Sequence, residues 1–245
     1  MVNFVCLKWG TKYDASFVNR LYTMIARNCR VPFTLHCCTE DPTDISSEIK
    51  IIPLPNYDLE SFWYKVWITS DEFPVEGKCI FFDLDIVIQN DLSKLIEYDC
   101  DDKILVLKAQ WRWDSIRKGM PMTRINSSVM VWDNTKRTDT MFNNMMTDPE
   151  FYMFRYNGND DYLEVRFKSD YDILPHEWFY CRVWGYDDTD PNRGEHAPDR
   201  YVDIWNIEIQ LYRMPERMIC LFNGIRDEEG IDSRIYDGFE YYWAD

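Results

Sequence analysis

The sequence contains no uninterrupted apolar run of eighteen residues, and no basic stretch followed by an apolar one at its start. A membrane-spanning helix needs about 20 consecutive apolar residues, and a signal peptide needs an apolar core behind a basic start, so neither is predicted. Positive charge is also scarce, since 27 Lys and Arg stand against 43 Asp and Glu and give a net charge of −16. A field of that sign repels nucleic acid and anionic membrane surfaces, so we expect neither as a partner.

The cysteines lack the spacing of a metal site or of a redox pair, because no CxxC occurs among the eight that the sequence contains. Most of them lie among apolar neighbours, which favours free, buried thiols in a reducing compartment and predicts a cytoplasmic protein. His36, Cys37 and Cys38 are adjacent and invite a zinc interpretation. Alternate residues of a strand face opposite ways, however, and no second ligand pair follows, so we do not predict zinc there.

Apolar residues make up 46% of the 245-residue chain and aromatic residues 16%, enough to fill a sizeable core. The length suits one large α/β domain, for which we predict the range 1–226, followed by an acidic, aromatic tail at 227–245 that is either an appendage or a lid. No internal repeat and no low-complexity segment interrupts this organisation.

Strand and helix patterns alternate along the first 90 residues. Apolar spacing predicts a helix over 16–28, with Asp14 or Ser16 as its cap, and another helix over 60–70. Such alternation is typical of a mainly parallel sheet with crossover helices. Further helices are predicted over 135–147 and 160–167, and an exposed loop over 185–200. The predicted strands cover 2–7, 33–38, 49–54, 79–85, 103–109, 127–133 and 217–225.

The most informative segment is CIFFDLDIVIQNDL, in which an apolar run carries Asp83 and Asp85. Residues i and i+2 of an extended segment point the same way, so both carboxylates can converge on one cation. Oxygen ligands suit Mg²⁺ or Mn²⁺, which usually hold a phosphate-bearing substrate. Ligands of parallel sheets bind at the carboxyl ends of the strands, where these residues fall. The alternative is a strand that ends in an ordinary polar turn.

Four other segments offer polar groups near predicted strand ends, and each also has an ordinary structural interpretation. The loop 7–13 can bind a planar base against Tyr13 or simply join a strand to a helix. Lys65 can approach phosphates or extend its amine to solvent from an apolar helix. Asn126, Ser127 and Ser128 suit sugar hydroxyls or cap a turn. Asn223, Gly224 and Arg226 suit a cation and a diphosphate, or form a turn.

The order of these segments resembles that of GT-A-fold, metal-dependent glycosyltransferases, in particular the glycogenin-like and bacterial lipopolysaccharide group. The matching segments span about residues 2–226: VNFVCLKWGTKYDASFVNRLYTMIARN, YKVWI, FFDLDIVIQNDLSKL, INSSVMVWD, GNDDYL and FNG. The resemblance implies the GT-A fold and the transfer of a hexose, UDP-glucose or UDP-galactose being the default donor, to a saccharide or glycan acceptor, with Mn²⁺ or Mg²⁺ and with retention of configuration.

The resemblance also implies roles for matching positions. Asp83, Leu84 and Asp85 correspond to the DxD segment, whose two acids hold the metal and the nucleotide. Asp160 and Asp161, together with Lys65, correspond to residues beside the reacting centre. Asn223 takes the place of the family's metal-binding histidine, Ser128 that of a glycine, and Asn159 and Asp160 those of Asp and Gln. The remaining donor-binding positions are Leu7, Lys8, Trp9, Gly10, Thr11, Tyr13, Asn126, Ser127, Gly224 and Arg226.

Two other functions remain open from the sequence. Asp-Leu-Asp-Ile-Val after an apolar strand also fits phosphatases of the haloacid dehalogenase type, in which the first aspartate attacks phosphorus. In those enzymes the motif lies on the first strand, whereas about 80 residues precede Asp83 here. A non-catalytic sugar-binding module is the other alternative, since 10 Trp and 16 Tyr suit carbohydrate stacking.

Overall fold

The computed structural model describes residues 1–120, 122–136, 140–186, 193–197, 199–202, 208–222 and 238–243. Its main sheet has seven strands in the order β3-β2-β1-β4-β7-β6-β8. Strand β7 is antiparallel to both of its neighbours, and the other neighbouring pairs are parallel. The predicted α/β architecture with a mainly parallel sheet is therefore confirmed. The strands are β1 Val2–Lys8, β2 Phe33–Thr39, β3 Lys50–Pro53, β4 Lys78–Phe82, β6 Ile104–Lys108, β7 Ile125–Asp133 and β8 Tyr171–Ile173.

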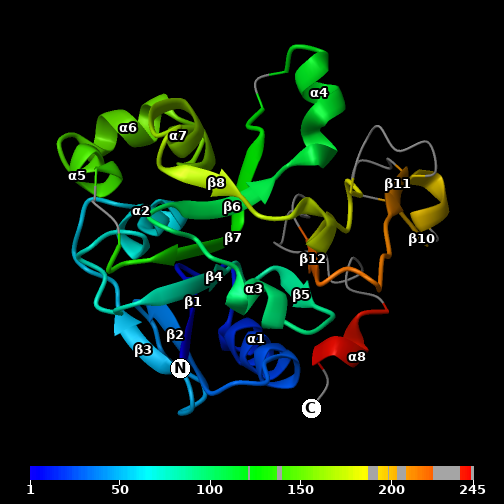
Figure 1. Ribbon diagram of the computed structural model, residues 1–245, viewed down its shortest axis with the longest axis horizontal. Helices are drawn as coiled ribbons and strands as arrows, with labels where there is room; N and C mark the ends of the chain where they lie inside the picture. The colour runs from blue at the N-terminus through cyan, green and yellow to red at the C-terminus, as the bar shows by residue number, and fades with distance from the viewer. Residues whose placement is uncertain are drawn as a thin grey trace.

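Two smaller sheets accompany the main sheet, and one of them includes the strand that follows β4. The strands β5 Ile86–Ile88, β12 Ile219–Leu221 and β9 Phe179–Cys181 form one sheet, with β12 in the middle. The strands β10 Asp199–Val202 and β11 Glu208–Leu211 form an antiparallel pair. In Figure 1 the orange strand β12 lies beside β5. A segment near the end of the chain therefore pairs with the strand that directly follows Asp83 and Asp85.

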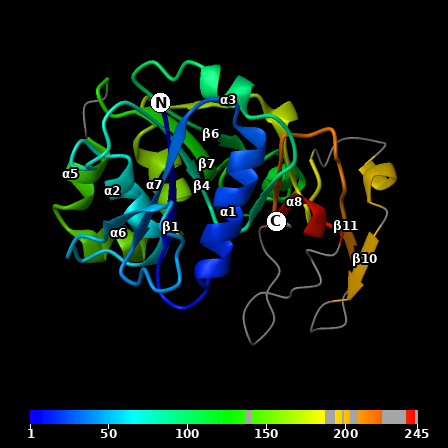
Figure 2. The same ribbon diagram turned by 90° about the horizontal axis from the view of Figure 1, so that it is seen from below.

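The main sheet lies between two helical layers, which Figures 1 and 2 show on its opposite faces. One core cluster packs α1 and the β5-β12-β9 sheet against one face, and a second packs α2, α5 and α7 against the other. No helix in the described ranges is long and apolar enough to span a membrane. The helices are α1 Ala15–Asn28, α2 Tyr64–Ile68, α3 Ser93–Glu97, α4 Trp113–Arg117, α5 Met141–Met145, α6 Pro149–Arg155, α7 Asn159–Arg166 and α8 Glu240–Trp243.

Helix α1 forms where the apolar spacing predicts it. Val18, Leu21 and Ile25 are fully buried against the sheet. The Asp14 carboxylate accepts the backbone N–H of Ser16 at 2.9 Å and satisfies one of the free amides at the helix start. The sequence pattern and the cap therefore act together at this element.

The structure separates the residues that invited a zinc interpretation. Cys37 packs in the cluster on the α1 face, and Cys38 packs in the cluster on the opposite face. All eight cysteines are free thiols. The described part of the chain holds no group of three or more His, Cys, Asp or Glu side chains that could bind a metal.

His36 lies on β2 with 7% of its surface exposed. Its Nε2 atom lies 3.2 Å from Asn3 Oδ1, and the Asn3 amide nitrogen donates to the Glu76 and Lys78 carbonyls. Nε2 is therefore the protonated nitrogen of a neutral ring. Burial, with a smaller contribution from the charge of Lys50, lowers the pKa of His36 to about 4.

We expect His36 to make the protein acid-sensitive. Its pKa is lower in the folded than in the unfolded chain, so stability is complete above about pH 6.5 and falls as the pH approaches 4, because only the unfolded chain binds the proton. Between pH 7 and pH 5 this costs about 2 kcal/mol of unfolding free energy. His36→Gln should lose that much less over the same interval, measured by urea unfolding at both pH values. Equal losses in the two proteins would refute the assignment.

The helix predicted over 135–147 is wrong at its start. Asp133 Oδ1 accepts the backbone N–H of Thr135 at 3.0 Å and turns the chain there. The helix in this region is α5, and α6 follows it with Asp148 as its cap and Pro149 in its first turn. The Asp-Pro signal for α6 was present in the sequence.

Candidate active site

Asp83 and Asp85 lie at the carboxyl end of β4, where polar groups from several elements meet. The backbone N–H of Asp83 donates to the Ser128 carbonyl of β7 at 2.9 Å. The Asp85 carbonyl accepts the N–H of Phe222, just after β12, at 2.9 Å. Because β7 runs antiparallel to β4, its first residues lie beside the last residues of β4. The two carboxylates are thus fixed between the main sheet and the small sheet.

Lys65 of α2 supplies a buried cation to this edge. Its side chain is 6% exposed, and Nζ lies 2.7 Å from Asp83 Oδ1. The same nitrogen lies 3.2 Å from the Ser127 carbonyl and 3.3 Å from Ser127 Oγ, and it sits 4.9 Å from the centre of the Phe81 ring. The alternative in which Lys65 extends to solvent is wrong, because the amine points into the protein.

Tyr13, from the loop after β1, contacts the second carboxylate. Its hydroxyl donates to Asp85 Oδ2 at 2.9 Å, the Lys12 amine lies 4.4 Å from the centre of its ring, and Phe17 packs edge-on against it. Burial raises the pKa of Asp85, and the negative charge of Asp83 raises it further. A carboxylate in that position is stabilised by added positive charge.

If the site binds UDP with Mn²⁺, we expect Tyr13→Phe to weaken that binding by about tenfold, because the hydroxyl orients one of the two carboxylates that would hold the cation. Tyr13→Ala should weaken it further, since the ring is lost as well. Calorimetry with UDP in saturating Mn²⁺ measures both. The control is Tyr98→Phe, which removes a hydroxyl at the other end of the sheet. Wild-type affinity in Tyr13→Phe would show that the hydroxyl does not support the site.

The start of β7 and the start of α7 meet beside Lys65. Asn126, Ser127 and Asn159 are all buried. Asn159 Nδ2 donates to Ser127 Oγ at 3.1 Å, and the Ser127 backbone N–H donates to Asp160 Oδ1 at 3.0 Å. Burial raises the pKa of Asp160, while the charge of Lys65 opposes the shift. These residues, predicted from separate segments, form one hydrogen-bonded group with the lysine.

Arg112 joins this group, although nothing in the sequence pattern singled it out. Its Nη1 donates to Thr123 Oγ1 at 2.5 Å and to the Ile125 carbonyl at 3.1 Å, and lies 3.9 Å from Asp160 Oδ2. Asp160 therefore lies between two cations, Lys65 and Arg112. Arg112 follows β6, which runs parallel to β4, and this position is the sequence signal that could have found it. Many arginines in loops have such a position, so the signal is weak.

The rest of the loop after β1 is closed by the end of β2. Lys8 is buried, and its amine donates to the Asp41 carbonyl at 3.1 Å and lies 3.6 Å from Asp41 Oδ2. The Gly10 N–H donates to Glu40 Oε1 at 2.6 Å. Leu7 is half-buried, and Trp9 and Thr11 are exposed. The Lys8 amine thus points toward the segment that follows β2.

Two predicted residues, Asp161 and Leu84, lie apart from this group, and three others lie outside the described residues. Asp161 Oδ2 accepts the Asn157 N–H at 3.1 Å and so bonds the segment just before its own helix. Leu84 is buried in the core between the two acids. Asn223, Gly224 and Arg226 lie outside the described residues.

The donor set at Asp83 and Asp85 fits Mn²⁺ or Mg²⁺. Both residues are half-buried and supply only carboxylate oxygens, which hard divalent cations prefer. Two ligands from the protein are enough for such ions when substrate phosphates and water complete the shell. Burial and the charge of Asp83 raise the pKa of Asp85, so a cation bound between the two acids would favour its ionised form.

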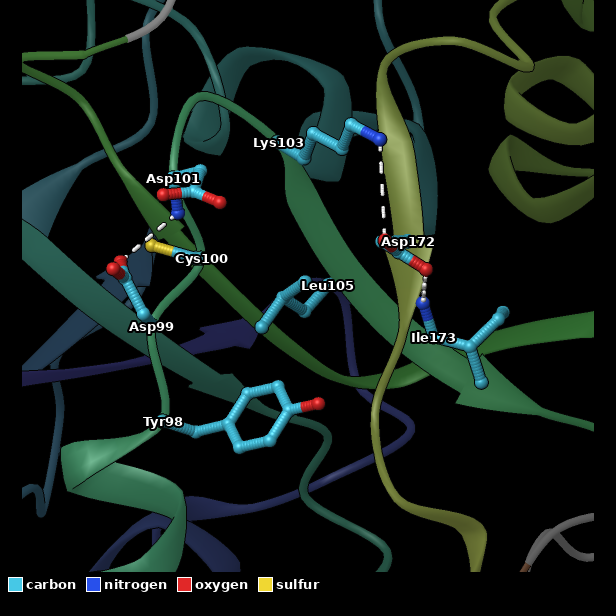
Figure 3. A pocket seen from close by; sticks show the side chains of 8 residues that line it. All are labelled: Tyr98, Asp99, Cys100, Asp101, Lys103, Leu105, Asp172 and Ile173. Atoms are coloured by element: carbon cyan, nitrogen blue, oxygen red, sulfur yellow. Dashed lines mark hydrogen bonds and ion pairs between the residues drawn. The ribbon is translucent and has the colours of Figure 1, made fainter.

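A separate pocket of about 350 Å³ opens at the other end of the sheet (Figure 3). It faces the starts of β6 and β8, and Tyr98, Cys100 and Leu105 contribute to its wall. Lys103 Nζ lies 3.9 Å from Asp172 Oδ2, and Asp99 Oδ1 lies 3.6 Å from Lys136 Nζ. Since β6 and β4 run the same way, this pocket is remote from Asp83 and Asp85.

Comparison with known proteins identifies the fold. No family model and no curated protein matches the sequence. Among solved structures, the glycosyltransferase GlyE of Streptococcus pneumoniae superposes with a TM-score of 0.64 at 14% identity, over 100% of this chain and 62% of GlyE. The galactosyltransferase LgtC, solved with donor and acceptor sugar analogues, gives a TM-score of 0.64 at 14% identity, over 98% of this chain and 94% of LgtC. The bifunctional glycosyltransferase WbbM gives 0.57 at 13%, over 100% of this chain and 50% of WbbM.

The chain has the GT-A glycosyltransferase fold. The resemblance predicted from the six sequence segments is thereby confirmed as a likeness of fold. At 13–14% identity it carries no residue roles with it, and the chain spans less than two thirds of GlyE. In a GT-A fold, as in other open α/β sheets, the carboxyl ends of the strands are where ligands bind, and Asp83, Asp85 and Tyr13 all lie there.

Proposed function

We propose that this protein transfers a hexose from a UDP-sugar to a saccharide acceptor, with Mn²⁺ or Mg²⁺ held by Asp83 and Asp85. The observation that carries the proposal is the meeting of these two carboxylates with Lys65 at a strand end of a GT-A fold. Two adjacent acids and one buried amine suit a nucleoside diphosphate bound through a divalent cation. UDP-glucose and UDP-galactose are the first donors to test, and the galactosyltransferase LgtC supports the second.

The chain's own residues have distinct roles in this proposal. Lys65 places a positive charge where the diphosphate separates from the sugar, in surroundings that exclude water and strengthen it. Asn126 and Ser127 offer polar groups to the sugar hydroxyls. Asp160, held by the Ser127 N–H and near Arg112, is the acid assigned to the neighbourhood of the anomeric carbon. When bound, the cation neutralises negative charge on the departing UDP.

Further parts of the proposal rest on the sequence resemblance alone. We infer transfer with retention of configuration, which proton NMR of the fresh product tests, and an inverted anomer would refute it. We assign Asn223 to the metal, Gly224 to close approach of the diphosphate, and Arg226 to its charge. Asn223→Ala should weaken metal binding in the presence of UDP, and Asn223→His should retain it.

The free cysteines support a cytoplasmic location.

One experiment separates the proposal from its alternatives. The protein is incubated with Mn²⁺ and UDP-sugars, and in parallel with model phosphate esters. Release of UDP supports the transferase, and release of phosphate from the esters supports a phosphatase of the haloacid dehalogenase type. Neither product, together with binding of sugars, indicates a carbohydrate-binding module. Thermal stabilisation by another nucleotide class, with none by UDP or UDP-sugars, would overturn the choice of uridine.

A further inference from the structure

The turn after β9, residues 181–185, is fixed at both ends. The Cys181 N–H donates to the Gly185 carbonyl and the Gly185 N–H to the Cys181 carbonyl, both at 2.8 Å. Gly185 has a φ of +76°, and a Cβ there would lie 2.9 Å from the Tyr212 ring. Only glycine fits this contact, so the turn lies directly on the ring of Tyr212.

The middle of the turn is anchored in the core. Arg182 has no exposed surface and Val183 is 5% exposed. The Arg182 backbone N–H donates to the Leu221 carbonyl at 2.7 Å, Nη1 donates to the Tyr212 carbonyl at 2.8 Å, and Nη2 lies 3.0 Å from Asp199 Oδ2. The backbone of the turn is therefore held by β12 and by the segment that follows β11.

Trp184 is the exposed residue of this buried turn. Its side chain is 49% exposed, whereas the two residues on either side of it are buried. A single exposed apolar side chain is ordinary on a protein surface. Trp184 differs from an ordinary exposed side chain because its backbone is already fixed. Little backbone entropy is therefore lost when a ligand binds to the indole.

The turn lies at the edge that carries the acids. Leu221 of β12 is paired with both Ile86 and Cys181, so Ile86 and Cys181 are two strand spacings apart, about 10 Å. Ile86 directly follows Asp85. The segment around Asp85 joins β4, whose neighbour is β1, to β5, whose neighbour is β12. The loop after β1 contacts Asp85 through Tyr13, and the turn after β9 is bonded to the end of β12, whose next residue Phe222 bonds the Asp85 carbonyl.

We propose that Trp184 is the platform on which a sugar ring of the acceptor stacks. The apolar C–H face of a pyranose packs on the flat face of an indole. This stacking leaves the sugar hydroxyls at the edge of the pyranose free to bond other groups. The assignment of this sugar as the acceptor rests on the proposed function, since the loop after β1 then takes the nucleotide. The proposed acceptor is therefore a saccharide that binds at the carboxyl end of β9.

The test uses saturation-transfer NMR of the full chain with four probes, the methyl α- and β-glycosides of glucose and galactose, with UDP and Mn²⁺ present. The wild type should bind at least one of them through its ring protons. Trp184→Ala should weaken that binding by roughly tenfold, and Trp184→Phe should retain most of it. The control is Phe154→Ala, which removes a 90% exposed ring from α6. All three variants should melt within about 2 °C of the wild type, because each change is at the surface.

Wild-type affinity in Trp184→Ala would overturn the platform, and so would a wild type that binds none of the four glycosides. Calorimetry of UDP with Mn²⁺ on the same proteins tests the donor site separately. Absence of UDP binding in the wild type would refute the proposed function and leave the sugar platform intact. An equal loss of UDP affinity and glycoside affinity in Trp184→Ala would refute a role confined to the acceptor.

Discussion

Asp85→Ala should remove the metal-dependent binding of UDP, with affinity in saturating Mn²⁺ reduced by roughly 100-fold or more. The change deletes one of the two carboxylates proposed for the cation and leaves the Tyr13 hydroxyl without its acceptor. Asp85→Asn keeps that acceptor and removes only the charge, so a similar loss in both variants would identify the charge as the cause. Calorimetry with UDP, in the presence and absence of Mn²⁺, measures each effect.

The matched control is Asp71→Ala, which removes an exposed acid away from β4. It changes the net charge by the same amount as Asp85→Ala, so any general electrostatic effect on UDP binding appears in both. Wild-type affinity in Asp85→Ala would remove the metal site from the proposal. Because burial and Asp83 already raise the pKa of Asp85, the loss of that residue should not in itself unfold the protein.

Lys65→Met should lower the rate of sugar transfer by about 100- to 1,000-fold, because it deletes a fixed charge from a site that excludes water. It should also destabilise the protein by about 3–5 kcal/mol, since Asp83 is left partly buried without its cation. Transfer is measured as UDP release from the UDP-sugar, and stability by urea unfolding. The control is Lys103→Met, whose ion pair with Asp172 is half-exposed and contributes at most about 1 kcal/mol.

A double variant separates the two effects of Lys65. Lys65→Met with Asp83→Asn removes the unpaired charge and should recover most of the stability. The rate should stay below that of Asp83→Asn alone, which already lacks one carboxylate proposed for the metal, because the cation near the leaving group is still missing. If the double variant regained transfer as well as stability, Lys65 would act only by maintaining the fold.

Other side chains of the protein already bind or flank the acids of the proposed site. Asp83 bonds Lys65, Asp85 bonds Tyr13, and Asp160 lies near Lys65 and Arg112. Each acid thus has a protein partner before any substrate is present. Because these partners already orient the carboxylates, the side chains lose little conformational entropy when a flexible diphosphate binds.

The sequence by itself determined the local elements and which polar groups stand at the end of β4. Apolar spacing and Asp14 gave α1, the apolar run gave β4, and two acids after that run indicated a cation and a diphosphate. These signals are readable because they depend on neighbours within one turn or one strand. The start of the helix predicted over 135–147 was wrong because another local contact competes there: the Asp133 side chain bonds the Thr135 N–H and favours a turn over the helical pattern that follows.

Only the tertiary structure decided which of these groups meet. The inward direction of Lys65, the contact of Asn159 with Ser127, and the approach of Arg112 to Asp160 depend on sheet order and on the antiparallel insertion of β7. The same holds for β12, which bonds the Asp85 backbone and holds the turn that carries Trp184. Pairings between residues more than 30 positions apart leave no periodic pattern in either segment. The sequence therefore supplies the groups, and the folded sheet brings them together.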